Sequence, residues 1–212
     1  IGKERLAETY TTTVNSLMCF CVGRSDLRLN EISPELIREY EAWLNEQGLV
    51  PNTTSFYMRN LRAIYNRAVE QGLTDDRSPF RHVYTGIGKT VKRAVPVQVI
   101  RRIKSLDLSF DHALQRSRDL FMFSFYTRGM PFVDMANLKK TDLRNGVLAY
   151  RRKKTGQRLY IKWEKPMQDI VDRYQDASSP YLLPIIATPG KGERRQYLNA
   201  IHLVNRHLRI IG

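Results

Sequence analysis

The chain has 212 residues, 42% of them hydrophobic, which is enough for one large domain or two small ones. Lys and Arg number 35 against 21 Asp and Glu, and a formal charge of +14 is typical of a protein that binds a polyanion. No apolar run approaches the roughly 18 residues of a membrane-spanning helix, and the start IGKERLAETY lacks the layout of a signal peptide. A merely basic protein, such as a ribosome-associated or membrane-surface protein, is the alternative to a nucleic-acid-binding one.

The two cysteines exclude a disulfide framework. Cys19 and Cys21 lie in one apolar helical stretch, too close together to form a bridge within a helix and without partners for a metal site. We expect both to be buried thiols of a protein in a reducing cytoplasm, with no metal and no cofactor.

Three helices are predicted in the first third of the chain. Apolar residues recur at three-to-four spacing from Arg5 to Cys21, as on one face of a helix. A second helix should begin after the N-cap Ser33, with Pro34 in its first position, and end at Gly48, while a third should run from Thr53 to Gln71. The residues expected to face the core are Leu6, Tyr10, Thr13 or Val14, Leu17 and Cys21; Leu36, Tyr40, Trp43 and Leu44; and Phe56, Leu61, Ile64, Tyr65 and Ala68.

Basic residues follow these helices. The third helix carries a second stripe of Arg59, Arg62 and Asn66, and residues 81–104 contain seven Lys or Arg and no acidic residue. The segment GIGKTVKRAVP has the Gly and Pro residues of a linker. We therefore expect a helical domain over residues 1–85, a basic linker over residues 86–96 and a second domain over residues 97–212.

The second domain should contain helices and one hairpin. The runs VLAYRRK and RLYIKW are β-like and are joined around KTGQ, with Gly156 in the turn. The sequence thus predicts a mainly α fold with a small β-hairpin or sheet. The expected helices are Val97–Leu106, Asp111–Tyr126 with a wholly apolar second half, Phe132–Leu138, Pro166–Tyr174 and about Glu193–Ile210.

This order of elements resembles the tyrosine recombinases, also called phage integrases, and most closely the integrases of Bacteroides-type mobile elements. The stretches that carry the resemblance are NTTSFYMRNLRAIYNRAVEQG, FSFYTRGMPFVDMANLKKTDL and YRRKKTGQRLYIKW. It implies a helical, SAM-like core-binding domain followed by the first part of an α+β catalytic domain. It also implies a bacterial, cytoplasmic, nucleoid-associated enzyme that cuts and rejoins duplex DNA without a metal, through a 3′-phosphotyrosyl intermediate.

The resemblance implies roles for particular residues. In the family, arginines hold the non-bridging phosphate oxygens and a hairpin lysine protonates the departing 5′-oxygen. The lysine matches Lys154, with Lys153 as its nearest rival. The first arginine usually lies three residues before an acidic residue that matches Asp134, but Pro131 occupies that position. We expect Arg128, where the chain turns into the next helix, to replace it, and a structural or surface role is the alternative. Asp134 should be structural, holding an arginine or capping a helix.

Other parts of the family pattern are not found in the chain. The resemblance implies a His-x-x-Arg box and, later, a nucleophilic tyrosine, but HLVNRHLR has the wrong spacing and all eleven tyrosines lie at or before Tyr197. The missing initial methionine and the abrupt end LRIIG also favour a piece of a longer protein. We expect this piece to be inactive and monomeric alone, and the complete protein to act as a tetramer on paired sites.

Basic side chains from both domains are expected to contact DNA phosphates, so that the two domains clamp a duplex between them. Two alternatives remain: a DNA-binding regulator or accessory factor without catalysis on the same scaffold, and an RNA-associated basic protein. The expected contacts are Arg59, Arg62, Lys89, Lys92 and Arg93 in the first domain and linker, and Lys139, Lys140, Arg151, Arg152 and Lys153 in the second.

Overall fold

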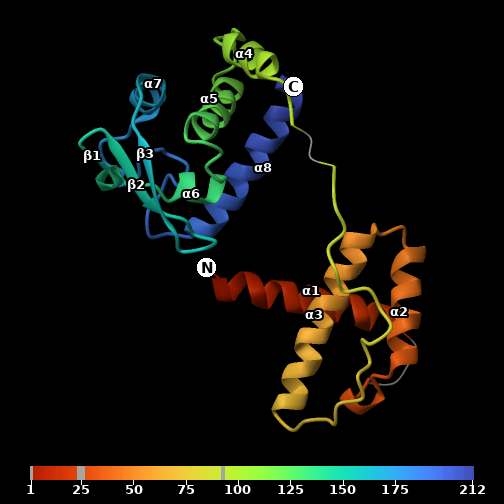
Figure 1. Cartoon of the computed structure of the whole chain (residues 1–212). Helices are drawn as coiled ribbons and strands as arrows, with labels where there is room; N and C mark the ends of the chain where they lie inside the picture. The colour runs from red at the N-terminus through yellow and green to blue at the C-terminus, as the bar shows by residue number, and fades with distance from the viewer. Residues whose placement is uncertain (1, 23–26, 92–93) are drawn as a thin grey trace. The chain divides into compact units, whose positions relative to one another are not determined.

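The computed structural model describes residues 2–22, 27–91 and 94–212. The chain forms two compact units, unit 1 (Ile1–Lys92) and unit 2 (Arg93–Gly212) (Figure 1). Each unit has its own hydrophobic core. The predicted fold class, mainly α with a small sheet, is confirmed. None of the described helices is both long enough and apolar enough to cross a membrane.

Unit 1 consists of three α-helices and one short 3₁₀ turn. They are α1 (Gly2–Phe20), the turn at Leu29–Glu31, α2 (Pro34–Glu46) and α3 (Pro51–Glu70). The start of α2 follows the prediction, because the Ser33 hydroxyl accepts a hydrogen bond from the Leu36 amide at 3.2 Å. Helix α3 begins earlier than predicted, since Pro51 is suited to the first position of a helix.

The core of unit 1 differs from the predicted one on two helices. On α3 the buried face runs through Thr54, Ser55, Met58 and Leu61, so Phe56 lies off that face and is 37% exposed. On α1 the buried residues belong to the second half of the helix, and Leu6 near its start is 47% exposed. The expected burial of Cys19 is also wrong: Cys19 is exposed near the end of α1, whereas Cys21, just after the helix, is buried, because residues two apart point to nearly opposite sides of a helical turn.

Unit 2 has a three-stranded antiparallel sheet with β2 in the centre, and α5 and α8 pack side by side (Figure 1). The predicted hairpin is β2 and β3, and the two-residue strand β1 was not predicted. Helix α6 ends at Ala136, before the predicted Leu138. The elements are α4 (Val97–Ser105), α5 (His112–Tyr126), α6 (Phe132–Ala136), a 3₁₀ turn (Lys140–Asp142), β1 (Leu143–Arg144), β2 (Val147–Arg151), β3 (Arg158–Lys162), α7 (Lys165–Tyr174) and α8 (Glu193–Ile211).

The sheet turns one face to the core of unit 2. Leu148 pairs with Ile161 and Tyr150 with Leu159, and these four side chains pack into the hydrophobic cluster of the unit. On α5, Phe123 is fully buried, and its ring meets that of Trp163 edge to face at 6.0 Å between centroids. The hairpin is therefore fixed to a helical core rather than held by its turn alone.

A buried carboxylate joins three helices of this core. Asp119 on α5 is 4% exposed and accepts hydrogen bonds from Arg118, from Arg173 at 2.5 Å and from the Tyr174 hydroxyl at 2.7 Å. Arg118 also donates to two backbone carbonyls at the end of α4. Burial, together with the bond to Asp119, raises the pKa of Tyr174 to about 12.

The raised pKa of Tyr174 should therefore make unit 2 less stable at alkaline pH. Its pKa in the folded chain, about 12, exceeds the ordinary 10.0, so unfolding releases a proton between these values and the free energy of unfolding falls as pH rises from 10 to 12. We expect a shallower fall in Tyr174→Phe. The measurement is urea unfolding followed by Trp163 fluorescence in a Trp43→Phe background. Tyr160→Phe, which changes an exposed tyrosine of the same unit, is the control and should keep the wild-type slope.

Candidate functional site

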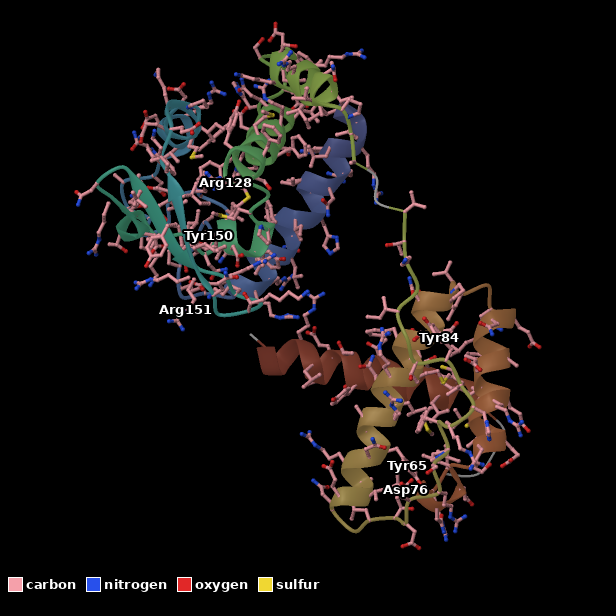
Figure 2. The ribbon with its side chains drawn as sticks, in the orientation of Figure 1. Tyr65, Asp76, Tyr84, Arg128, Tyr150 and Arg151 are labelled. Atoms are coloured by element: carbon pink, nitrogen blue, oxygen red, sulfur yellow. The ribbon has the colours of Figure 1, made fainter. Side chains whose placement is uncertain are left out.

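The turn between β2 and β3 presents a group of basic side chains at the end of the sheet. The Arg152 amide donates to the Gln157 carbonyl at 2.8 Å, and the Gly156 amide donates to the Arg152 carbonyl at 2.8 Å. Gly156 has a φ of 70°, which a glycine adopts without strain. Lys153 and Lys154 are exposed at this turn, and Arg151 projects away from the body of unit 2 (Figure 2).

A buried carboxylate on a neighbouring helix accepts a hydrogen bond from the backbone of this turn. Asp134 on α6 is 2% exposed, and its Oδ1 accepts the backbone amide of Lys153 at 2.9 Å. The predicted structural role of this acid thus involves a backbone amide of the turn. Its second oxygen and the Arg152 Nε are both buried, and neither has a partner among the described residues. Burial and, after it, the charge of Asp134 raise the pKa of Tyr150, so this tyrosine lies within electrostatic range of the buried acid.

Lys153 and Lys154 differ in their surroundings. The charges of Lys153 and Lys139 help lower the pKa of Glu193, although the larger causes are hydrogen bonds from the Gly190 amide and the Tyr181 hydroxyl. Lys153 therefore acts electrostatically on the acid at the start of α8. No such interaction is found for Lys154 among the described residues.

Arg128 lies at the C-terminal end of α5. Its amide donates to the Phe125 carbonyl at 3.0 Å and the Gly129 amide donates to the Ser124 carbonyl at 2.8 Å, the pair of bonds of a Schellman motif. Arg128 occupies the left-handed position of this motif, with a φ of 61°, where glycine is usual. Helix α6 begins only at Phe132, so Arg128 lies at the end of one helix rather than at the start of the next.

An arginine in this conformation is strained. A left-handed backbone costs an L-residue with a Cβ roughly 1–2 kcal/mol. The Arg128 side chain is exposed, and no hydrogen bond or ion pair links it to another described residue. Strain of this kind is concentrated at functional sites, although a cation at a helix C-terminus also gains from the helix dipole.

Two of the expected DNA contacts, Arg59 and Arg62, lie on α3, where they and two further side chains hold a later segment of the chain. The Arg59 guanidinium donates to the Gly86 carbonyl at 2.8 Å, and Arg62 donates to the Thr85 hydroxyl at 3.1 Å. Ser55 donates to the same Gly86 carbonyl, and Asn52 exchanges two hydrogen bonds with the backbone of Gly88. We call Asn52, Ser55, Arg59 and Arg62 the α3 clasp. The first residues of the expected linker thus pack against unit 1.

The remaining basic residues fall into three groups. Lys89, Lys139 and Arg151 are exposed. Lys140 donates from its ammonium to the Asp176 carbonyl at 2.6 Å, so it has a protein partner. Lys92 and Arg93 lie outside the described residues.

A shallow hollow next to the clasp was not predicted. It has a volume of about 260 Å³ and lies between Arg62 and Asn66 of α3 and the loop from Asp76 to Arg81. Tyr65 fixes this loop, since its hydroxyl donates to the Asp75 carbonyl at 2.9 Å and accepts the Arg77 amide at 3.2 Å (Figure 2). The polar stripe on α3 was the only sequence signal for it.

Comparison with known proteins agrees with this architecture. Residues 2–83 match the phage integrase SAM-like domain family. No curated protein sequence matches the chain. A lambda integrase dimer bound to a COC′ core site matches the structure with a TM-score of 0.63 and 14% identity, over 92% of this chain and 72% of that chain.

Two further solved structures share the fold. A lambda integrase tetramer bound to a Holliday junction gives a TM-score of 0.64 at 12% identity, over 93% of this chain and 57% of that chain. The Tn1549 transposon integrase in complex with a circular intermediate DNA gives 0.54 at 14% identity, over 84% of this chain and 68% of that chain.

Unit 1 is therefore a phage integrase SAM-like domain. Unit 2 continues the fold of the solved integrases, which is the fold that the sequence motifs predicted.

Removing the Asp134 carboxylate should loosen the turn. In Asp134→Ala the partly buried Lys153 amide loses its acceptor, which costs about 1 kcal/mol of stability. Amide exchange from Lys153 to Gly156, followed by mass spectrometry, should accelerate. Asp134→Asn is the matched control, because its side-chain oxygen still accepts the bond. Equal rates of amide exchange in Asp134→Ala and the wild type would show that the bond to Asp134 does not restrain the turn.

Relieving the strain at Arg128 should stabilise the chain. Arg128→Gly removes the Cβ from a left-handed position, and after the entropy cost of glycine the free energy of unfolding should rise by about 0.5–1 kcal/mol. Thermal and urea unfolding measure this change. Asn145→Gly, at a φ of 49°, is the control and should gain less, because asparagine tolerates this conformation. A loss of stability in Arg128→Gly would show instead that the arginine side chain supports α5.

Proposed function

We propose that the chain is the DNA-binding and lysine-bearing part of a site-specific DNA recombinase, which cleaves and rejoins duplex DNA through a 3′-phosphotyrosyl intermediate. The family of unit 1, the fold of unit 2 and the net charge of +14 support this proposal. Phosphotyrosyl chemistry needs no metal, because the attacking group, the proton donor and the cations that balance the phosphate charge are all side chains.

The observation that carries the proposal is the tethered basic turn of the hairpin. In the proposed reaction Lys154 donates a proton to the 5′-oxygen that leaves the phosphorus. A proton donor must be held in place to act, and the bond from Asp134 to the neighbouring Lys153 amide restrains the backbone of this turn. The proximity of Lys153 to the charge of Glu193 favours Lys154 over Lys153 in this role.

Arg128 is proposed to bind the non-bridging oxygens of the scissile phosphate. A guanidinium can donate two parallel hydrogen bonds to a phosphate, and its charge favours the more negative transition state. The strained backbone and the free, exposed side chain support this role, since a glycine would suit the fold better. No nucleophile is assigned within the chain, because none of its tyrosines follows a His-x-x-Arg box.

Both units are proposed to contact one DNA duplex, mainly through its phosphates. Arg151, Lys153, Lys139 and Lys89 are exposed and available for such contacts. Arg59, Arg62 and Lys140 would have to leave their protein partners, and Lys92 and Arg93 extend the basic linker. Binding should weaken with salt, with a slope of about 0.9 for each phosphate contact. By analogy with the lambda integrase tetramer, the complete protein is proposed to act as a tetramer.

The test is covalent trapping of the protein expressed from its complete gene on a nicked suicide substrate. Lys154→Ala should slow formation of the covalent complex by about 10²–10⁴-fold, the usual contribution of a general acid. A substrate with sulfur in place of the leaving 5′-oxygen should restore the rate, since a thiolate leaves without a proton. Lys153→Ala separates the two lysines: it should weaken DNA binding by one phosphate contact, but at saturating protein it should form the covalent complex at a similar rate with both substrates.

The same assay examines Arg128. Arg128→Ala should be slow with both substrates, because the sulfur substitution does not replace a charge on the phosphate. A wild-type rate in Arg128→Ala would show that Arg128 does not bind the scissile phosphate. The absence of any covalent complex in the wild type would favour a DNA-binding regulator without catalysis.

A further inference from the structure

We propose that the outward face of the three-stranded sheet is a binding platform for single-stranded DNA, with Tyr160 stacking on an unpaired base. This inference goes beyond the proposed cleavage site, which lies at the turn. The preference for DNA over RNA rests on the proposed function, whereas the stacking rests only on the sheet.

The register of the sheet defines this outward face. Leu148, Tyr150 and Ile161 are buried, and side chains alternate along a strand, so their neighbours point the other way. Residues paired directly across two strands share a face. The outward side chains therefore form three rows, which are Arg144, Val147 and Lys162; Ala149 and Tyr160; and Arg151 and Arg158.

Tyr160 lies in the middle row and is 63% exposed. Its cross-strand partner is Ala149, whose small side chain leaves the ring uncovered on that side. No described aromatic ring contacts it, unlike the packed rings of the core. A tyrosine on an open sheet provides a flat surface the size of a base, and base–aromatic stacking of this kind occurs in single-strand-binding folds.

Cations surround the ring on both sides. Arg144 and Lys162 belong to the first row and Arg151 and Arg158 to the third, and none of the three strands contains an acidic residue. None of these four cations forms an ion pair with a described residue. Arg151 and Arg158 are directly opposite each other, an unfavourable pairing in a hairpin that a bound phosphate would relieve.

Single-stranded DNA fits this arrangement better than a duplex. In a duplex each base is covered by its neighbours, so phosphates could satisfy the arginines but nothing could stack on Tyr160. In a single strand the bases are free while the phosphates remain, and both features of the face are then used. Cutting and exchanging strands exposes DNA of this kind.

The test is binding of a labelled oligothymidylate of about 12 nucleotides, within the 4–16 that a small platform covers, by fluorescence anisotropy. Tyr160→Thr keeps a β-branched residue in the strand and removes the ring, and it should weaken binding by at least about fivefold. Tyr160→Phe keeps the ring and should stay within about twofold. Arg158→Gln should lower the salt slope by about 0.7, the contribution of one phosphate on a single strand.

The controls separate the platform from general effects. Phe110, 78% exposed between α4 and α5, is a second surface aromatic of unit 2, and Phe110→Ala should not change binding. Thermal unfolding should show that Tyr160→Thr remains folded. Unchanged oligothymidylate binding in Tyr160→Thr, an equal loss of duplex binding in that variant, or tighter binding of oligouridylate would each overturn the proposal. The trapping assay with Lys154→Ala reports on cleavage independently, so either proposal can fail alone.

Discussion

The hydrogen bond from the Lys153 amide to the buried Asp134 carboxylate is the constraint on which the basic turn depends. Helix α6, which carries Asp134, is itself fixed by the end of α5, where the Ser124 hydroxyl donates to the Met130 carbonyl at 2.8 Å. The turn also closes on itself through the Gly156 amide. The backbone that carries the two lysines is therefore held by the core of unit 2, and partial burial of the bond shields it from water.

The same unit accepts two features that lower its own stability. Arg128 occupies a backbone conformation that suits glycine, and Arg151 and Arg158 are paired with like charge across the hairpin. The like charges across the hairpin do not help the fold, and the buried network around Asp119 and the packed ring of Phe123 stabilise the unit in spite of both features. A stable core of this kind tolerates a strained and strongly charged edge, as is common where proteins bind anions.

Sequence patterns predicted the elements of this structure better than the partners of its polar groups. Helices with clear apolar spacing and a capping residue, such as the one after Ser33, were predicted well, and Gly156 located the hairpin turn. Strand β1 was not predicted, because a strand of two residues is too short to show the alternation of apolar and polar side chains. Asp134 bonds an amide in another element, and Lys140 bonds carbonyls after α7, and no local pattern encodes such contacts. Basic residues also look alike in a sequence whether they face solvent or a carbonyl.

The α3 clasp changes how charge-removal mutants of this chain should be interpreted. Arg59 and Arg62 hold the backbone and side chains of the segment that leaves unit 1, so an alanine at either position would free that segment as well as delete a cation. Lost nucleic-acid affinity in such a mutant would then have two causes that the affinity alone cannot separate. Asn52 offers a way to distinguish them, because it holds the same segment at Gly88 through a neutral side chain.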